Sequence, residues 1–448
     1  MIIDFLTRAK EKRSAQRLWR ERVVAYAQEV NAYIEDGRSK GWEHVGDEPE
    51  DPNVAHLVEQ AVAAVRRANE RNETGNLRDL WPPCHRSLIP LLEQNGQSIP
   101  TVCLLDDGSL LARIGAPYED GRTVRLVGNG VEELPHVGFF GRCPNRRFFA
   151  ICSDTGVEIK DGWSGPTTAV CRWPTGLEGI PEKLKAEPLA DIPTPTAVIP
   201  FPDGLKALLV SADGIFVLSE TLAVRLLPTE SAIEEFAEWS LREHPEDSPV
   251  PDLSMEHAAI SPSGRLIAAG SQDSTHMVFD EKFTVVADVE PMSEYPHYAI
   301  FSADESIVAV NSCHFYNGMT LGIRTDLLPG LKTNSWEKDA RIPILEDNAR
   351  VYAGVSRNDE FIIGDAGGYV RAFSFDGKFR WEIFVGSSID DIDVSPDRKT
   401  LIVSTYAGFI SFIELDAGGQ PDYQIGTGGH REVYRWLFWK NEDKPLIW

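Results

Sequence analysis

Paired cysteines are missing from this sequence. Six cysteines occur among 448 residues, and no two of them form a C-x-x-C pair. Several lie in apolar segments, as Cys152 does after Phe149-Ala150-Ile151. This pattern disfavours a disulfide scaffold and predicts buried free thiols in a reducing compartment.

Long apolar runs are also missing. No run approaches the roughly 20 residues that a membrane helix needs. The first residues become charged at Asp4 and Arg8, which is atypical of a secretory signal peptide. We therefore expect a cytoplasmic protein that does not enter a membrane.

Basic residues are scarce. Lysine and arginine number 44 against 69 acidic residues, and the formal net charge is -25. Such a chain repels phosphate backbones and anionic lipid surfaces, which argues against nucleic-acid and membrane partners. The same charge would attract a protein partner with a basic face.

The common catalytic motifs are absent. The chain contains no G-x-x-x-x-G-K-[ST], no H-E-x-x-H and no G-x-S-x-G, and its ten histidines have no metal-ligand spacing. We expect no catalytic residue, no metal and no cofactor, and a non-catalytic protein is favoured over an enzyme. One alternative stays open, since Asp391 and Asp393 alternate along a strand and could contribute to a metal site in a propeller channel.

Helical periodicity is present in residues 1–95. Apolar residues recur every three or four positions between Arg17 and Glu35, and again between Asn53 and Arg71. Asp51-Pro52-Asn53 is a suitable start for the second helix, and Trp81-Pro82-Pro83 interrupts helix afterwards. Residues 1–95 are therefore predicted to form a helical N-terminal extension. The first apolar stripe consists of Trp19, Val23, Tyr26, Val30 and Tyr33.

Short strands dominate residues 96–448. A unit of strand, polar turn and apolar strand recurs, and its turn serines are Ser261, Ser302, Ser356 and Ser395. These serines are spaced by 41, 54 and 39 residues. A repeat of about 40 to 50 residues made of strands is the period of a β-propeller blade.

One of these units resembles a known repeat. The segment from Ser261 to Asp280 is similar to the central stretch of a WD repeat, with Phe279-Asp280 where that family has Trp-Asp. Gly429-His430 precedes Trp439 by the spacing at which the family's Gly-His dipeptide precedes its turn. The resemblance covers residues 100 to 448, although most repeats lack both dipeptides. It implies a propeller fold and no particular activity.

Six complete units and one split unit give seven blades. In this hypothesis Gly429–Trp448 supplies the inner strands of the last blade, and residues 101–105 and 109–114 supply its outer strands. Such a join would leave no open sheet edge. The predicted fold is therefore mainly β, a seven-bladed β-propeller over residues 96–448 with the last blade closed by the C-terminal segment. Six or eight blades stay open as alternatives.

Three long connections, residues 160–195, 229–252 and 313–343, are the predicted places for partner binding. The segment Ala232–Leu241 has helical amphipathicity with an acidic outer side. It is either a solvated rim helix or a docking site for a basic partner. The candidate partner-binding residues are Glu234, Glu235, Glu238, Trp163, Arg172, Trp173, Tyr316 and Trp336.

The sequence thus favours a non-catalytic protein–protein interaction module or scaffold. Its specific form would be a bacterial inhibitor or immunity-type protein that blocks a basic toxin or enzyme. A propeller hydrolase or lactonase with a channel metal is the competing class. A third possibility is a scaffold subunit that docks through its helical extension. No small-molecule substrate is expected.

Overall fold

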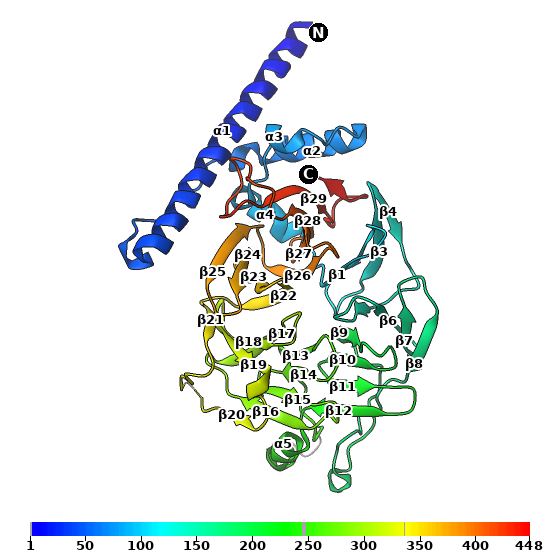
Figure 1. Cartoon of the computed structure of the whole chain (residues 1–448). Coiled ribbons are helices and arrows are strands. Elements are labelled where there is room, and N and C mark those ends of the chain that lie inside the picture. The colour runs from blue at the N-terminus through cyan, green and yellow to red at the C-terminus, as the bar shows by residue number, and fades with distance from the viewer. Residues whose placement is uncertain (1, 244–247, 336) are drawn as a thin grey trace. The chain divides into compact units, whose positions relative to one another are not determined.

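The computed structural model describes residues 2–243, 248–335 and 337–448, and its described side chains begin at Arg13 and omit Leu241 (Figure 1). Seven mainly antiparallel sheets follow one another along this part of the chain, each built mainly from consecutive strands, and the pair β16–β20 is parallel. The protein is therefore a seven-bladed β-propeller preceded by helices, as predicted.

The blades are numbered in chain order. Within each blade the strands are given from the innermost strand outward. Blade 1 contains β1 (Thr101–Leu104), β2 (Leu110–Ile114), β3 (Arg122–Val127) and β4 (Gly130–Glu133). Blade 2 contains β5 (Phe140–Arg142), β6 (Phe148–Ser153), β7 (Gly156–Asp161) and β8 (Thr167–Cys171). Blade 3 contains β9 (Pro195–Pro200), β10 (Ala207–Ser211), β11 (Gly214–Leu218) and β12 (Ala223–Leu227).

Blade 4 has a fifth strand and contains β13 (His257–Ile260), β14 (Ile267–Gly270), β15 (His276–Phe279), β16 (Val285–Val289) and β20 (Leu331–Lys332). Blade 5 contains β17 (Tyr295–Phe301), β18 (Ile307–His314), β19 (Asn317–Arg324) and β21 (Ile344–Asp347). Blade 6 contains β22 (Val351–Arg357), β23 (Glu360–Asp365), β24 (Tyr369–Ser374) and β25 (Phe379–Phe384). Blade 7 contains β26 (Ile389–Val394), β27 (Thr400–Thr405), β28 (Phe409–Glu414), β29 (Arg431–Leu437) and β30 (Leu446–Ile447).

The predicted split blade is wrong. β1 and β2 pair with each other and then with β3 and β4, so residues 101–133 build a complete blade. The C-terminal strands β29 and β30 complete blade 7 instead, since β29 pairs with β28. A hairpin closes only a short loop, so its entropic cost is small. The hairpins of blade 1 therefore fill the backbone hydrogen bonds of β2 and β3 without a strand from the other end of the chain.

The recurrent turn serine has a structural role in its hairpin. Ser261, Ser302 and Ser395 are buried. Each hydroxyl oxygen accepts a hydrogen bond from the backbone amide five residues later, at 3.2, 3.0 and 2.9 Å respectively. At these three positions the serine thereby satisfies a backbone donor inside a tight turn. The fourth predicted turn serine, Ser356, lies within β22 instead, and its hydroxyl oxygen accepts a hydrogen bond from the Ala303 amide at 2.9 Å.

The chain divides into two compact units. One unit combines the N-terminal segment up to Pro100 with Gly367–Arg371 and Arg380–Trp448, and the other comprises Thr101–Ala366 and Ala372–Phe379. In the second unit the innermost strands β1, β5, β9, β13, β17 and β22 contact one another in this order, as the inner strands of successive propeller blades do.

The first unit contains the N-terminal helices: α1 (Ile2–Lys40), α2 (Val58–Arg71), α3 (Leu77–Leu80) and α4 (His85–Asn95). Trp19, Val23 and Val30 of the predicted stripe are buried, whereas Tyr26 and Tyr33 are half-buried. Trp19 and Val23 share an apolar cluster with Phe409 and Trp448, residues of blade 7 and the C-terminus. The indole nitrogen of Trp448 donates to the Trp81 carbonyl at 2.7 Å, and this bond ties the C-terminus to the helical segment.

All six cysteines are buried free thiols, as predicted. Burial is the main cause that raises the thiol pKa of five of them, to about 12 at Cys152; the five are Cys84, Cys143, Cys152, Cys171 and Cys313. These thiols are therefore protonated and poorly nucleophilic at neutral pH. Among the helices described, none has the length and apolarity needed to cross a membrane.

Candidate functional site

The acidic connection between blades 3 and 4 forms the helix α5 (Glu230–Glu243). Ile233 and Ala237 are fully buried and Phe236 is half-buried, so the predicted apolar face exists. The Thr229 hydroxyl accepts the Ala232 amide at 3.3 Å, which satisfies a donor at the helix start. Buried anchors of this kind hold the outer face of α5 in a defined orientation. The side chain of Leu241, the last member of the predicted face, lies outside the described residues.

The outer face of α5 carries the predicted acids. Glu235 and Glu238 are exposed. The Lys183 ammonium group donates a hydrogen bond to the Glu234 carboxylate at 2.5 Å. This bond raises the pKa of Lys183. Trp239 is 49% exposed, and its ring lies 5.8 Å from the Phe236 ring. The structure thus places a partly exposed indole beside two exposed glutamates, while Glu234 is engaged within the protein.

Trp163 and Trp173 fold back onto the protein. The Trp163 ring packs edge-on against the Phe140 and Phe149 rings at 5.8 and 5.6 Å. The Trp173 indole nitrogen donates to the Ser153 carbonyl at 2.9 Å. Both side chains therefore contribute to packing around blade 2.

Two other predicted residues have different surroundings. Arg172 is exposed, and its backbone amide donates to the Ser219 carbonyl at 3.1 Å. Trp336 lies outside the described residues. The expectation of long loops was partly wrong, because residues 160–195 contain β8 and residues 313–343 contain β19 and β20. These strands pair within their own blades: β8 pairs with β7, β19 with β18, and β20 with β16.

Tyr316 lies at a tight hairpin tip between β18 and β19. It is 76% exposed, and the adjacent Phe315 is 73% exposed. Phe315 has a φ of 48°, the left-handed region that a phenylalanine rarely adopts. Arg350 holds the tip, because its side chain donates to the Phe315 carbonyl and its backbone amide to the Tyr316 carbonyl, at 3.1 and 3.2 Å. Two aromatic rings are thus presented to solvent on a fixed turn.

The acids of β26 accept hydrogen bonds from backbone amides. Asp391 and Asp393 each accept the amide of the following residue at 2.8 Å. Asp390 accepts the Ser98 hydroxyl and the Ile99 amide at 2.5 and 2.6 Å, and burial raises its pKa to about 6. Across residues 2–243, 248–335 and 337–448, no group of three or more histidine, cysteine or acidic side chains is placed to hold a metal ion.

Three histidines near the inner strands of blades 4 and 5 are buried. Burial lowers the pKa of His257 to about 4, and burial together with Arg350 lowers that of His297 to about 3. The His276 ring lies 5.9 Å from the His257 ring, and its Nε2 is 2.9 Å from the Ser312 hydroxyl. All three are neutral near pH 7 and act as packed polar groups.

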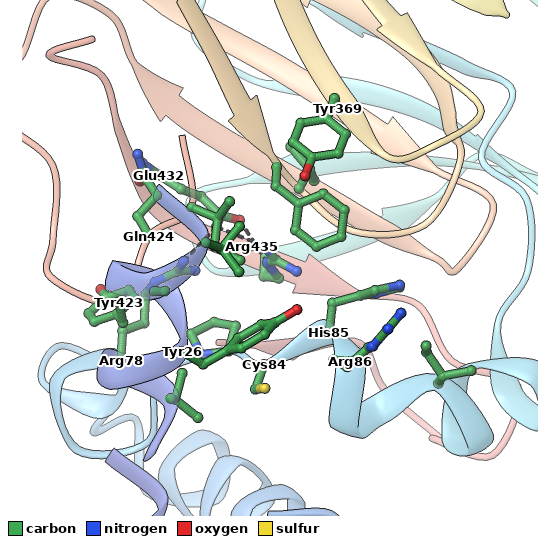
Figure 2. A pocket seen from close by; sticks show the side chains of 18 of the residues that line it. Tyr26, Arg78, Cys84, His85, Arg86, Tyr369, Tyr423, Gln424, Glu432 and Arg435 are labelled. Atoms are coloured by element: carbon green, nitrogen blue, oxygen red, sulfur yellow. Dashed lines mark hydrogen bonds and ion pairs between the residues drawn. The ribbon is translucent and has the colours of Figure 1, made fainter. Parts of the chain in front are cut away.

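A cavity of about 290 Å³ lies within the first unit (Figure 2). The α1 helix, the start of α4, the Tyr423–Ile425 segment and β29 contribute to its wall, together with residues at the start of β24 and the end of β25. Figure 2 shows the hydroxyl of Tyr26 directed toward the side where His85 and Arg86 lie. No single segment of sequence contains this site.

A buried ion triad forms part of the cavity wall. Arg435 binds the two oxygens of Glu432 through Nε and one terminal nitrogen, both at 2.7 Å, and Arg78 binds Glu432 at 2.5 Å. Burial alone would raise the pKa of Glu432, but the two guanidinium groups hold it at about 2. Sequence reasoning missed this triad, since 354 residues separate Arg78 from Glu432 and no local motif joins them.

No family model matches the chain, and no curated protein matches it. Solved structures do match. One is the β-propeller domain of Cps50 (Swd1) from Myceliophteria thermophila, at 11% sequence identity and a TM-score of 0.45. The match covers 68% of this chain and 92% of that chain. At this identity the WD-repeat resemblance of Ser261–Asp280 stays a prediction about sequence family.

Proposed function

We propose that this protein is a non-catalytic interaction protein whose α5 helix binds a protein partner with a basic face. The supporting observation is the outer side of α5, where Trp239 is partly exposed beside Glu235 and Glu238. Tryptophan is enriched among residues that dominate binding energy, and surrounding charges increase association rates. An inhibitor or immunity-type protein that blocks a basic toxin or enzyme is the specific form we favour.

The charge of the full chain supports the same partner class. A formal net charge of -25 disfavours nucleic acids and anionic membranes and attracts basic proteins. The helix is also anchored by Ile233 and Ala237, so little ordering of its backbone is needed on binding. These features support a preformed acidic surface on α5.

The test starts with affinity purification of the full chain from its native source and mass spectrometry of bound proteins. Association with the purified partner is then measured by surface plasmon resonance for Glu235→Gln/Glu238→Gln and for Trp239→Ala. We expect slower association for the glutamine pair, weakening with added salt, and faster dissociation for Trp239→Ala by about tenfold or more. The melting temperature of the glutamine pair should stay close to that of the wild type, because exposed charges contribute little to folding.

The matched control is Glu132→Gln/Glu187→Gln, which removes two exposed acids from other parts of the same unit. If this control slows association as much as the α5 pair does, only net charge matters and α5 is not the docking site. Unchanged kinetics for all α5 variants would refute the proposal.

A further inference from the structure

The cavity of the first unit has a charge balance opposite to that of the chain. Its charged lining consists of Arg78, Arg86 and Arg435 against Glu48 and Glu432. The chain as a whole has 69 acidic and 44 basic residues. A locally cationic recess in an acidic protein is not explained by composition, and the protein interaction at α5 does not use it.

Two buried nitrogens of the lining have no hydrogen-bond partner among the described residues. Arg78 is 8% exposed, and its Nε has no hydrogen-bond partner. The Nδ1 atom of His85, also in the lining, is buried without a partner as well. One carboxylate, Glu432, faces two guanidinium groups, so this triad keeps one positive charge. The net positive charge of the triad therefore favours an anionic acceptor in the recess.

Aromatic rings also line the recess, beside aliphatic side chains such as Val30 and Ile89. Tyr26, Tyr369, Phe384 and Tyr423 line it, and the Phe384 ring lies 4.9 Å from the Tyr369 ring and 5.5 Å from the His85 ring. Apolar and aromatic walls with a few convergent polar groups are typical of small-molecule sites. A volume of about 290 Å³ lies just below the usual range of such sites, about 300–1,000 Å³, and suits a small ligand.

We propose that this cavity binds a small aromatic carboxylate. Its ring would lie among Tyr26, Tyr369 and Phe384, and its carboxylate would face Arg86 and the Arg78–Glu432–Arg435 triad. The positive surroundings are also evident at His85, because burial, Arg435 and Arg86 lower its pKa to about 4. His85 is therefore neutral near pH 7 and can donate a hydrogen bond without adding charge.

The probes are benzoate, cinnamate and indole-3-acetate, each compared with its primary amide, which keeps the ring and removes the charge. Binding to the full chain is measured by isothermal titration calorimetry and ligand-observed NMR. We expect at least one acid to bind, and its amide to bind about tenfold more weakly or worse, because hydrogen bonds to charged groups are the stronger ones.

Three variants assign the binding to this cavity. Arg86→Gln removes an exposed cation of the lining and should weaken the acid about tenfold. Ile89→Trp fills part of the cavity and should weaken both acid and amide. Arg71→Gln, an exposed arginine at the end of α2 outside the lining, is the control and should leave binding unchanged. Circular dichroism checks that each variant is folded.

Several results would overturn the proposal. The proposal is refuted if none of the three acids binds at concentrations up to about 10 mM. Equal binding of acid and amide would leave an apolar pocket without anion selectivity. Binding that survives Arg86→Gln and Ile89→Trp but is lost in Arg71→Gln would place the acid elsewhere. None of these results affects the proposed role of α5.

Discussion

Glu432 is the side chain on which two buried arginines depend. It is 6% exposed and neutralises part of the charge of Arg78 and Arg435, which are 8% and 5% exposed. Arg78 also donates to the Trp448 carbonyl at 3.1 Å, so the triad connects α3, β29 and the C-terminus. A buried charge left alone is costly, whereas a paired one is tolerated.

We therefore expect Glu432→Gln to lower the free energy of unfolding by about 3–5 kcal/mol, because two guanidinium groups would lose their counter-charge inside the protein. Urea unfolding at pH 7 measures this loss. Glu414→Gln is the control, since Glu414 pairs with Arg431 at 2.9 Å where both side chains are half-exposed. It should cost about 1 kcal/mol or less. Similar costs for both variants would contradict a structural role of the triad.

The same carboxylate predicts a pH dependence. Its pKa in the folded protein is about 2, below the ordinary value of 4.5. Its contribution to stability is therefore complete above about pH 4.5 and is lost as the pH falls toward 2. The difference in unfolding free energy between wild type and Glu432→Gln should shrink over this range. A difference that stays constant from pH 5 to pH 2.5 would disagree with the assigned pKa.

The tip of the β18–β19 hairpin exposes two aromatic side chains, Phe315 and Tyr316. Phe315 is 73% exposed and adopts a left-handed backbone conformation, which asparagine tolerates better. The ring packs edge-on against the His314 ring at 4.5 Å. A phenylalanine in this backbone conformation therefore carries strain that its few contacts offset only in part.

Replacement of this ring should leave the fold intact. We expect Phe315→Asn to change the free energy of unfolding by no more than about 0.5 kcal/mol, or to raise it, because little buried area is lost and the turn is relieved. Phe361→Ala is the buried comparison at 2% exposure and should cost about 3–5 kcal/mol. Urea unfolding of both variants gives the answer, and a cost above 2 kcal/mol for Phe315→Asn would show that the tip is structural.

The C-terminal segment contributes strands, ion pairs and apolar side chains to the first unit. Residues 429–448 supply β29 and β30, the Glu432 and Arg435 members of the triad, and Trp439 and Trp448 of the apolar cluster shared with α1 and α2. Removal of this segment would expose the edge of β28 and the apolar faces of the helices.

Deletion of Gly429–Trp448 should therefore produce an aggregated or unfolded protein. Size-exclusion chromatography and thermal unfolding by circular dichroism test this outcome. Trp448→Ala alone should stay soluble, with a melting temperature lowered by several degrees, since only one side chain of the cluster is lost. A truncated protein that is monodisperse and melts like the wild type would contradict this role of the segment.

Much of the architecture was predictable because it depends on neighbours in the chain. The three- and four-residue spacing around Trp19 and Val23 predicts a helix with one buried face, and the turn serines predict hairpins at blade intervals. The amphipathic α5 was predictable for the same reason. Exposure of Trp239 and Phe315 was not, because periodicity assigns a face but not what covers it.

The remainder depends on contacts between distant residues. The sequence pattern predicts that Thr101–Leu104 shares a blade with the C-terminal strands. In the structure this strand pairs with its chain neighbour β2 and belongs to blade 1. Arg78 and Glu432 appear unrelated in the chain, and only packing of α1, α3 and α4 with residues of blades 6 and 7 creates their triad and the cavity beside it. Local periodicity encodes helices, strands and turns, whereas the charge and volume of a recess arise only after those elements have packed.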